Sequence, residues 1–208
     1  QGGNNVDCSQ TDNSKQPYLN DIKEGLYFSG DRVLRIDTRI GEFINLEDYN
    51  NFSLFCHCFS TSSSSFGLIG GGNRFHLERN ASTDAWRVRL SKSGIFENST
   101  DRIYTKFIYN RSTNIGFSYS QNNNTFSFYQ DGLLRQRIRE VNIPDTDFDL
   151  NPNPIMSPNI LEIGSSLEGL RRPWVGYIRE MFLFNQPLEG KDFEILDSIS
   201  VAVKYENI

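Results

Sequence analysis

The chain has 208 residues, a formal net charge of −5 and many aromatic residues, with 16 Phe and 9 Tyr. An acidic chain without clustered Lys and Arg is poorly suited to neutralise phosphates, so the composition argues against a nucleic-acid partner. No apolar run approaches the ~18 residues that a membrane-spanning helix needs, so direct membrane insertion is not expected. Aromatic side chains fit half-buried pleated surfaces, and a chain of this length can form one all-β domain.

The first 20 residues are polar, and we predict an extended leader over residues 1–20 with little local structure, followed by one domain over residues 21–208. The domain begins with short apolar or alternating runs bounded by turn residues, which is typical of strands. These predicted strands are 26–28, 33–36, 42–46, 52–60, 74–78, 86–90 and 102–109. The run 52–60 is apolar on both faces, which indicates a central strand. After it, we expect Gly70, Gly71 and Gly72 to form a bend between strands.

Residues 113–141 predict three antiparallel strands joined by two turns. Ile115, Phe117 and Tyr119 alternate with small or polar residues, which is the period-two pattern of a strand with one face covered. Asp131-Gly132 predicts a tight hairpin, because Gly accepts the positive φ that such turns require. The third strand carries Arg135, Arg137 and Arg139 at strand spacing, which favours a solvated or ligand-facing strand over a nucleic-acid stripe.

The C-terminal third begins with a long loop over residues 142–159 that is rich in Pro, Asp and Asn. A strand is predicted over 161–166, and residues 173–196 predict a strand, a turn and one short helix. Phe193 and Leu196 are three residues apart and would lie on the buried side of that helix. The run 200–205 predicts a final strand.

The three cysteines are Cys8, Cys56 and Cys58. Positions 56 and 58 project to the same face of a strand, so a disulfide between them is disfavoured. A bridge from Cys8 to one of them, with Cys58 as the predicted partner, would pin the leader to the sheet. The alternative is that Cys56 and Cys58 are buried small hydrophobic residues. A zinc site is disfavoured, because strand alternation turns His57 away from its neighbours.

Five positions fit the N-glycosylation sequon, which is a modest excess over chance in an Asn-rich chain. They are Asn51, Asn80, Asn98, Asn110 and Asn123. Their number favours a secreted or cell-surface location, so we expect an extracellular glycoprotein.

Four stretches in order resemble the laminin-G-like, or concanavalin-A-like, jelly-roll superfamily. They are GLYFSGDRVLRI (25–36), NFSLFCHCFS (51–60), TFSFYQDG (125–132) and WVGYIREMFLFNQPLEGKDFEIL (174–196). The resemblance implies a two-sheet antiparallel β-sandwich with one short C-terminal helix. Family members mostly recognise glycans or protein partners, often with bound calcium, and some are appended to sialidases, adhesins or toxins. A minority are glycoside hydrolases.

Calcium is the one cofactor that the sequence suggests. Asp145, Asp147 and Asp149 place carboxylate oxygens at every second residue of the long loop, and hard cations prefer several oxygen ligands from a flexible segment. The pattern is not an EF-hand, because Leu150 stands where a Gly is required. A solvated acidic loop is the alternative.

Candidate ligand-binding residues are Trp86 and Trp174, together with Arg171 and Arg172. Exposed aromatic faces stack on sugar rings, and the two arginines beside Trp174 could pair with an acidic glycan. Both tryptophans could instead pack in the core or at the rim, and the arginines could belong to a soluble loop.

The sequence lacks the carboxylate arrangement of a sandwich-fold glycosidase, such as Glu-x-Asp-x-Glu on one strand, and it lacks a Gly-x-Ser-x-Gly elbow. We therefore predict a non-catalytic, lectin-like or adhesion module that binds a glycan or an extracellular protein, with calcium as a candidate cofactor. The alternative is a structural subunit that uses the sandwich faces to pack in an oligomer or larger assembly. A glycoside hydrolase is the least favoured class.

Overall fold

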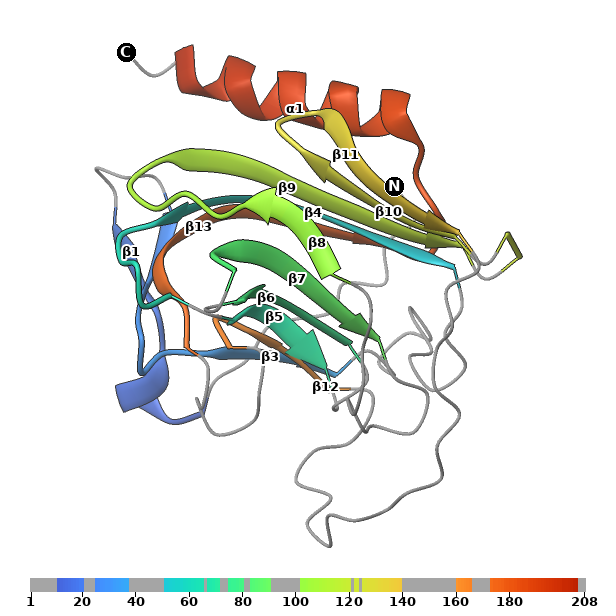
Figure 1. The fold of residues 1–208 in the computed structure, drawn as a ribbon. Helices are drawn as coiled ribbons and strands as arrows, with labels where there is room; N and C mark the ends of the chain where they lie inside the picture. Colours follow the sequence, from blue (N-terminus) through green and yellow to red (C-terminus); the bar gives the residue numbers. More distant parts are fainter. Residues whose placement is uncertain are drawn as a thin grey trace, which may run out of the picture.

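The computed structural model describes residues 11–20, 25–37, 51–65, 67–71, 75–80, 83–90, 102–120, 122–123, 125–139, 160–165 and 173–205. Within these ranges the strands form two antiparallel sheets that face each other, and one helix covers the outside of the larger sheet (Figure 1). The fold is therefore a two-sheet β-sandwich of the jelly-roll kind with one C-terminal helix, which confirms the predicted fold class.

The described strands divide into a larger and a smaller sheet. The larger sheet has the order β1 (Tyr18–Asn20), β2 (Gly25–Ser29), β13 (Val175–Phe184), β4 (Phe52–Ser60), β9 (Ser112–Ser120), β10 (Thr125–Gln130) and β11 (Leu133–Arg139). The smaller sheet has the order β3 (Leu34–Asp37), β12 (Ile160–Ile163), β5 (Gly67–Gly71), β6 (Phe75–Asn80), β7 (Ala85–Leu90) and β8 (Arg102–Lys106). A short 3-10 helix, η1 (Asn13–Lys15), precedes β1, and α1 (Gly190–Tyr205) follows β13.

The core lies between the sheets, where the inward-facing residues of both sheets meet. The rings of Trp86 and Trp174 stack with centroids 6.2 Å apart, and Phe107 packs edge-on against both. All three side chains are buried. Removing large aromatic side chains from water is among the strongest contributions to folding, at about 1.5–3 kcal/mol for each fully buried side chain. These rings therefore help to hold the two layers together.

Strand β4 is buried on both faces, as the sequence predicted. It pairs with β13 on one side and β9 on the other, so it is a central strand. Leu54 and Cys56 face the other sheet, whereas Phe55 belongs to a second apolar cluster beneath α1. His57 points away from Cys56 and Cys58 and contacts Ser200 of α1.

Cys56 and Cys58 are both free thiols buried in the core. The predicted bridge from Cys8 to Cys58 is therefore not formed, and the alternative of buried small hydrophobic residues describes both positions. Cys8 itself lies outside the described residues. Burial raises the pKa of the Cys56 thiol well above its usual range, and a hydrogen bond with Cys58 adds to this effect.

We expect neither core thiol to react with a maleimide reagent while the protein is folded. Both thiols are buried, so the reagent cannot reach them, and the raised pKa of Cys56 also disfavours its reactive thiolate form. The measurement is mass spectrometry of a Cys8→Ser protein treated with reagent in buffer and in guanidinium chloride. Two additions in guanidinium chloride and none in buffer are expected. Rapid modification of the folded protein would contradict this position for Cys56 and Cys58.

The predicted three-stranded meander is β9, β10 and β11, paired in that order. Its second turn has positive φ at both Asp131 (51°) and Gly132 (72°), as a tight hairpin requires. The expectation of one covered face for β9 needs correction, because α1 covers the other face as well. Gly116 allows this close approach, since a Cβ there would overlap the ring of Phe193.

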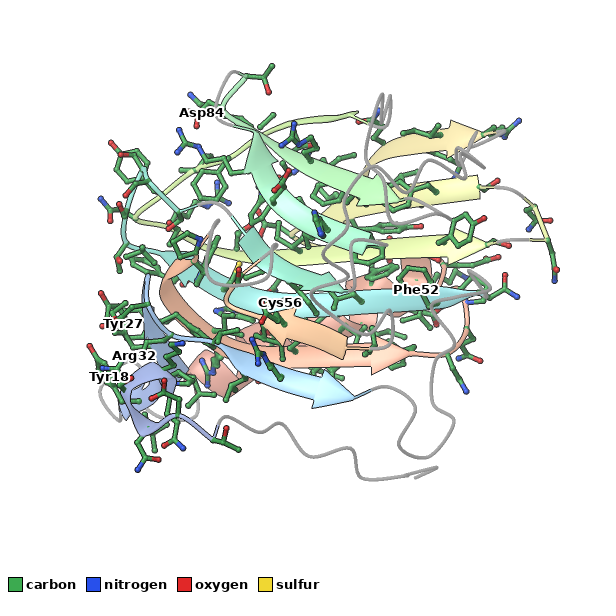
Figure 2. All side chains as sticks on the ribbon, turned by 90° about the horizontal axis from the view of Figure 1, so that it is seen from below. Tyr18, Tyr27, Arg32, Phe52, Cys56 and Asp84 are labelled. Carbon is green, nitrogen blue, oxygen red and sulfur yellow. The ribbon has the colours of Figure 1, made fainter. Side chains whose placement is uncertain are left out.

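Residues 18–20, which the sequence assigned to the leader, form the edge strand β1. Tyr18 packs against Tyr27 of β2 with ring centroids 5.1 Å apart, and the guanidinium of Arg32 lies over the Tyr18 ring. Figure 2 shows these three side chains together at one end of the sandwich. The backbone N–H of Val33 also donates to the carbonyl of Lys15 at 2.9 Å. This segment is therefore part of the sheet, whereas residues 1–10 lie outside the described residues.

Two local predictions were wrong. The run 200–205 continues α1 to Tyr205 and does not form a strand. Gly70 and Gly71 belong to strand β5 and do not form a bend. Predicted strand 42–46 and loop 142–159 lie outside the described residues. Among the described helices, none is both long enough and apolar enough to cross a membrane.

Candidate functional site

A groove of about 370 Å³ lies on the outer face of the larger sheet, beside the connection from β13 to α1. Its lining residues are Ser118, Ser120, Asn123, Thr125, Ser127, Tyr129, Arg137, Arg139, Pro187, Leu188 and Glu189. Hydroxyl and amide groups dominate this set, so we refer to it as the hydroxyl groove. In Figure 1 the strands β9, β10 and β11 that form its floor lie directly below α1.

The floor of the hydroxyl groove is made of two cross-strand rows. In the first row, Ser118 of β9 pairs with Ser127 of β10, which pairs with Arg137 of β11. In the second row, Ser120 pairs with Thr125, which pairs with Arg139. Each row runs from a small hydroxyl to a second hydroxyl and ends in a guanidinium. The meander places them together because side chains two residues apart share one face of a strand.

The phenylalanines of the same strands face the opposite way, into the core. Phe126 and Phe128 alternate with the hydroxyl residues of β10, and both are buried in the core cluster. Ile138 packs on that cluster between the two groove arginines. The apolar residues therefore fix which side chains of the meander point outward, and this fixes the composition of the groove.

One end of the groove is apolar and firmly held. Tyr129 stacks on Phe193 of α1 with ring centroids 4.1 Å apart and an interplanar angle of 21°. The backbone N–H of Leu188 donates to Ser53 Oγ at 2.7 Å, and that hydroxyl donates to the carbonyl of Gln186 at 2.9 Å. These contacts anchor the residues before α1 against the sheet. The wall beside the hydroxyl rows is therefore preformed.

The two groove arginines differ in how they are held. Arg137 Nε donates to Ser127 Oγ at 3.1 Å, which orients its guanidinium group over the floor. Arg139 is exposed and forms no ion pair within the described residues. Glu189 is the single carboxylate among the lining residues. The groove can therefore bind polar and charged groups, but its lining does not supply the two opposed carboxylates that glycoside hydrolysis needs.

A second polar cluster lies beneath α1, and its serine and histidine are buried. Ser200 Oγ lies 2.9 Å from His57 Nδ1, and Asn114 Nδ2 donates to Asp197 Oδ1 at 2.6 Å. Ser200 is 1% exposed and His57 is 4% exposed, so a substrate cannot reach this serine–histidine pair. The cluster instead satisfies polar groups where the helix meets the sheet. Its contribution is to hold α1 in place.

The predicted site residues do not converge on this groove. Trp86 is 1% exposed and Trp174 is 0% exposed, so neither ring offers a face to a sugar. We therefore correct their ligand-binding assignment: both are core residues, which was the alternative left open from the sequence. Arg171 and Arg172 lie outside the described residues.

The calcium and glycosylation predictions are only partly covered by the structure. Asp145, Asp147 and Asp149 lie outside the described residues. Within the part of the chain that is described, no group of three or more His, Cys, Asp or Glu side chains could hold a metal ion. Of the sequons, Asn110 and Asn123 are exposed and Asn51 is half-buried, Asn80 ends β6, and Asn98 is outside the described part. Asn123 also lines the hydroxyl groove.

The groove residues carried a partial signal in the sequence. The outward alternation of Ser118 and Ser120, and the same-face spacing of the arginines in β11, were both visible there. The missing information was the strand register, because a bulge between Phe128 and Tyr129 determines which β11 residues oppose which hydroxyls. The wall from Pro187 to Glu189 is distant in sequence and comes from tertiary packing.

No protein-family model and no curated protein matches the sequence. Similar solved structures exist. Botulinum neurotoxin type C, described as depending on interaction with two ganglioside molecules to enter cells, aligns at 14% identity and a TM-score of 0.62, over 94% of this chain and 47% of that chain. The binding domain of botulinum neurotoxin DC in complex with rat synaptotagmin II aligns at 16% identity and a TM-score of 0.61, over 88% of this chain and 45% of that chain.

A Trypanosoma rangeli sialidase in complex with 2,3-difluorosialic acid, as a covalent intermediate, aligns at 13% identity and a TM-score of 0.56, over 84% of this chain and 27% of that chain. The present chain thus spans about half the length of the toxin chains and about a quarter of the sialidase. At these identities the likeness concerns the fold. The chain therefore shares its jelly-roll sandwich with parts of carbohydrate-related and receptor-related proteins.

Proposed function

We propose that this chain is a non-catalytic recognition module that binds a glycan in the hydroxyl groove. The observation that carries the proposal is the floor of paired hydroxyls, Ser118 with Ser127 and Ser120 with Thr125, beside a preformed apolar wall. A sugar presents several hydroxyls around an apolar ring face, so convergent small polar groups next to such a wall suit it. The fold that the chain shares with a ganglioside-dependent toxin and a sialidase supports this class of ligand.

Three finer parts of the proposal rest on the sequence. An extracellular or cell-surface location is supported by the five sequons. Membership of the laminin-G-like branch is supported by the four motifs between residues 25 and 196. Calcium assistance is supported by the alternating aspartates of residues 145–149, whose carboxylates are the ligand type that calcium prefers.

A structural subunit is the second candidate function, and one observation favours it. Phe182 of β13 and Ile195 and Ile199 of α1 are large apolar side chains that are 44%, 56% and 55% exposed. Exposed apolar residues on the outside of a sandwich can pack against another chain. In that case the protein would self-associate or co-purify with a partner, and it would not bind glycans.

A glycan microarray with groove-filling variants tests the proposal. The protein is produced in bacteria so that Asn123, which lines the groove, carries no glycan. Ser120→Tyr places a large side chain in the groove, whereas Ser112→Tyr makes the same change on the same face of β9 outside the groove lining. We expect the wild type and Ser112→Tyr to bind the same glycans and Ser120→Tyr to bind them about tenfold more weakly or not at all.

Other outcomes would contradict the proposal. Equal weakening by the two variants would place the site elsewhere. A lack of glycan binding together with stable self-association in light scattering would favour the structural subunit. Release of any sugar from the array would indicate a hydrolase. Repeating the array with a chelator shows whether calcium contributes, since loss of binding is expected only if the ion assists.

A further inference from the structure

Among the residues that the structure describes, no carboxylate forms an ion pair with Arg137 or Arg139, although the chain has 26 acidic and 21 basic residues. Five other described arginines each pair with a carboxylate: Arg32, Arg35, Arg79, Arg87 and Arg111. Arg137 and Arg139 form no such pair within the described residues, although Glu189 lines the same groove. Within the described residues, the positive charge of these two groove arginines is therefore not neutralised by an ion pair.

The arrangement of the two guanidinium groups suits an anion. Arg137 is oriented through Nε by Ser127 Oγ, and Nε is only one of its five N–H donors. Arg139 follows two residues later on the same face and lies opposite Thr125. Two cations on neighbouring same-face positions repel each other, and an anion bound between them relieves that repulsion.

We infer that the ligand of the hydroxyl groove is an acidic sugar whose carboxylate is bound by Arg137 and Arg139. This inference rests on the function proposed above and names the class of glycan. A guanidinium group presents a planar fork of donors that matches a carboxylate in a bidentate manner. The remaining ring hydroxyls of the sugar lie over the two hydroxyl rows. The volume of about 370 Å³ is at the lower end of small-molecule sites, which favours one or two sugar units over a long chain.

The experiment compares acidic and neutral forms of the same glycan. Immobilised sialyllactose is paired with lactose, a glucuronic-acid-terminated disaccharide with its glucose-terminated form, and sulfated lactose is included. The proteins are the wild type, Arg137→Gln, Arg139→Gln and Arg137→Lys. Arg135→Gln is the matched control, because Arg135 is an exposed residue of the same strand outside the groove lining. Thermal unfolding of each variant shows that it is folded.

We expect at least one carboxylated glycan to bind and its neutral form to bind about tenfold more weakly or not at all. Arg137→Gln and Arg139→Gln should each weaken binding by about tenfold or more, Arg137→Lys by less, and Arg135→Gln by less than about twofold. Added salt should also weaken binding, because partly exposed charges are screened.

Three outcomes would overturn the inference, and they separate it from the proposed function. In the first, neutral glycans bind as well as acidic ones, and binding is lost in Ser120→Tyr but unchanged in the arginine variants. That result would support the glycan site in the hydroxyl groove and contradict an acidic ligand. Sulfated lactose that binds in preference to both carboxylated glycans would show that the anion is not a carboxylate. If the protein binds no glycan at all, both the proposed glycan-binding function and the acidic ligand are contradicted.

Discussion

Replacing Gly176 with alanine is expected to destabilise the protein strongly. Gly176 has a φ of +150° in β13, where it pairs with Ser60 of the central strand β4. A Cβ at this position would overlap the carbonyl oxygen of Phe59 and lie 2.8 Å from the Cα of Ser60. Both are backbone atoms, so relief requires the two central strands of the larger sheet to separate.

The expected cost of Gly176→Ala is about 4 kcal/mol or more, because steric overlap with a backbone is added to an unfavourable φ. This is a large fraction of the ~5–15 kcal/mol that stabilises a typical domain. For a chain of this size, each kcal/mol shifts Tm by about 2–4 °C, so a Tm loss of about 10 °C or failure to fold is expected.

Gly190→Ala is the matched control for this measurement. A Cβ at Gly190 would meet only Tyr129 Cε1 at 3.9 Å, which is ordinary van der Waals contact. Alanine also favours the helix that begins there, so its Tm should remain within a few degrees of the wild type. Tm is measured by circular dichroism or calorimetry. Similar Tm values for the two variants would show that the backbones of β13 and β4 do not approach each other closely at Gly176.

The second large effect is expected at Gly116, where the helix meets the sheet. In Gly116→Ala the new Cβ overlaps Cδ1 and Cε1 of Phe193, and this ring is fixed by its stacking on Tyr129. Overpacking of this kind typically costs about 1–3 kcal/mol. Since Tyr129 also lines the hydroxyl groove, we expect glycan binding to weaken together with stability.

A double-mutant cycle isolates this contact. Phe193→Ala alone should cost about 3–5 kcal/mol, because it leaves a cavity under the helix. Combined with Gly116→Ala, it should cost less than the sum of the two single changes, by about 0.5–3 kcal/mol, since the overlap no longer exists. Denaturant unfolding of the four proteins gives the coupling energy. Strictly additive costs would mean that Phe193 does not sit over Gly116.

Most of the sandwich could be predicted because its strands carry the signal locally. The alternation of Ile115, Phe117 and Tyr119, and the turn at Asp131-Gly132, each identify a strand or hairpin within a few residues. The predicted strand over residues 200–205 was wrong for a physical reason. Its valines favour strands, but Val costs only a few tenths of a kcal/mol in a helix that is already formed and docked.

The site was harder to predict, because its features depend on contacts between distant residues. A tryptophan looks the same in sequence whether it stacks in the core or on a ligand, and only the packing of Trp86 against Trp174 distinguishes the two. The hydroxyl groove requires the register of β9 with β10 and of β10 with β11, and it also requires a wall from Pro187 to Glu189. These relations are set by the tertiary fold and not by any single motif.

Strand β11 lies at one end of the larger sheet. An edge strand presents unpaired backbone N–H and C=O groups, to which the same strand of a second molecule can add. Arg135, Arg137 and Arg139 give this edge a dense positive charge, which repels an identical edge that approaches it. These charges therefore disfavour edge-to-edge aggregation through β11.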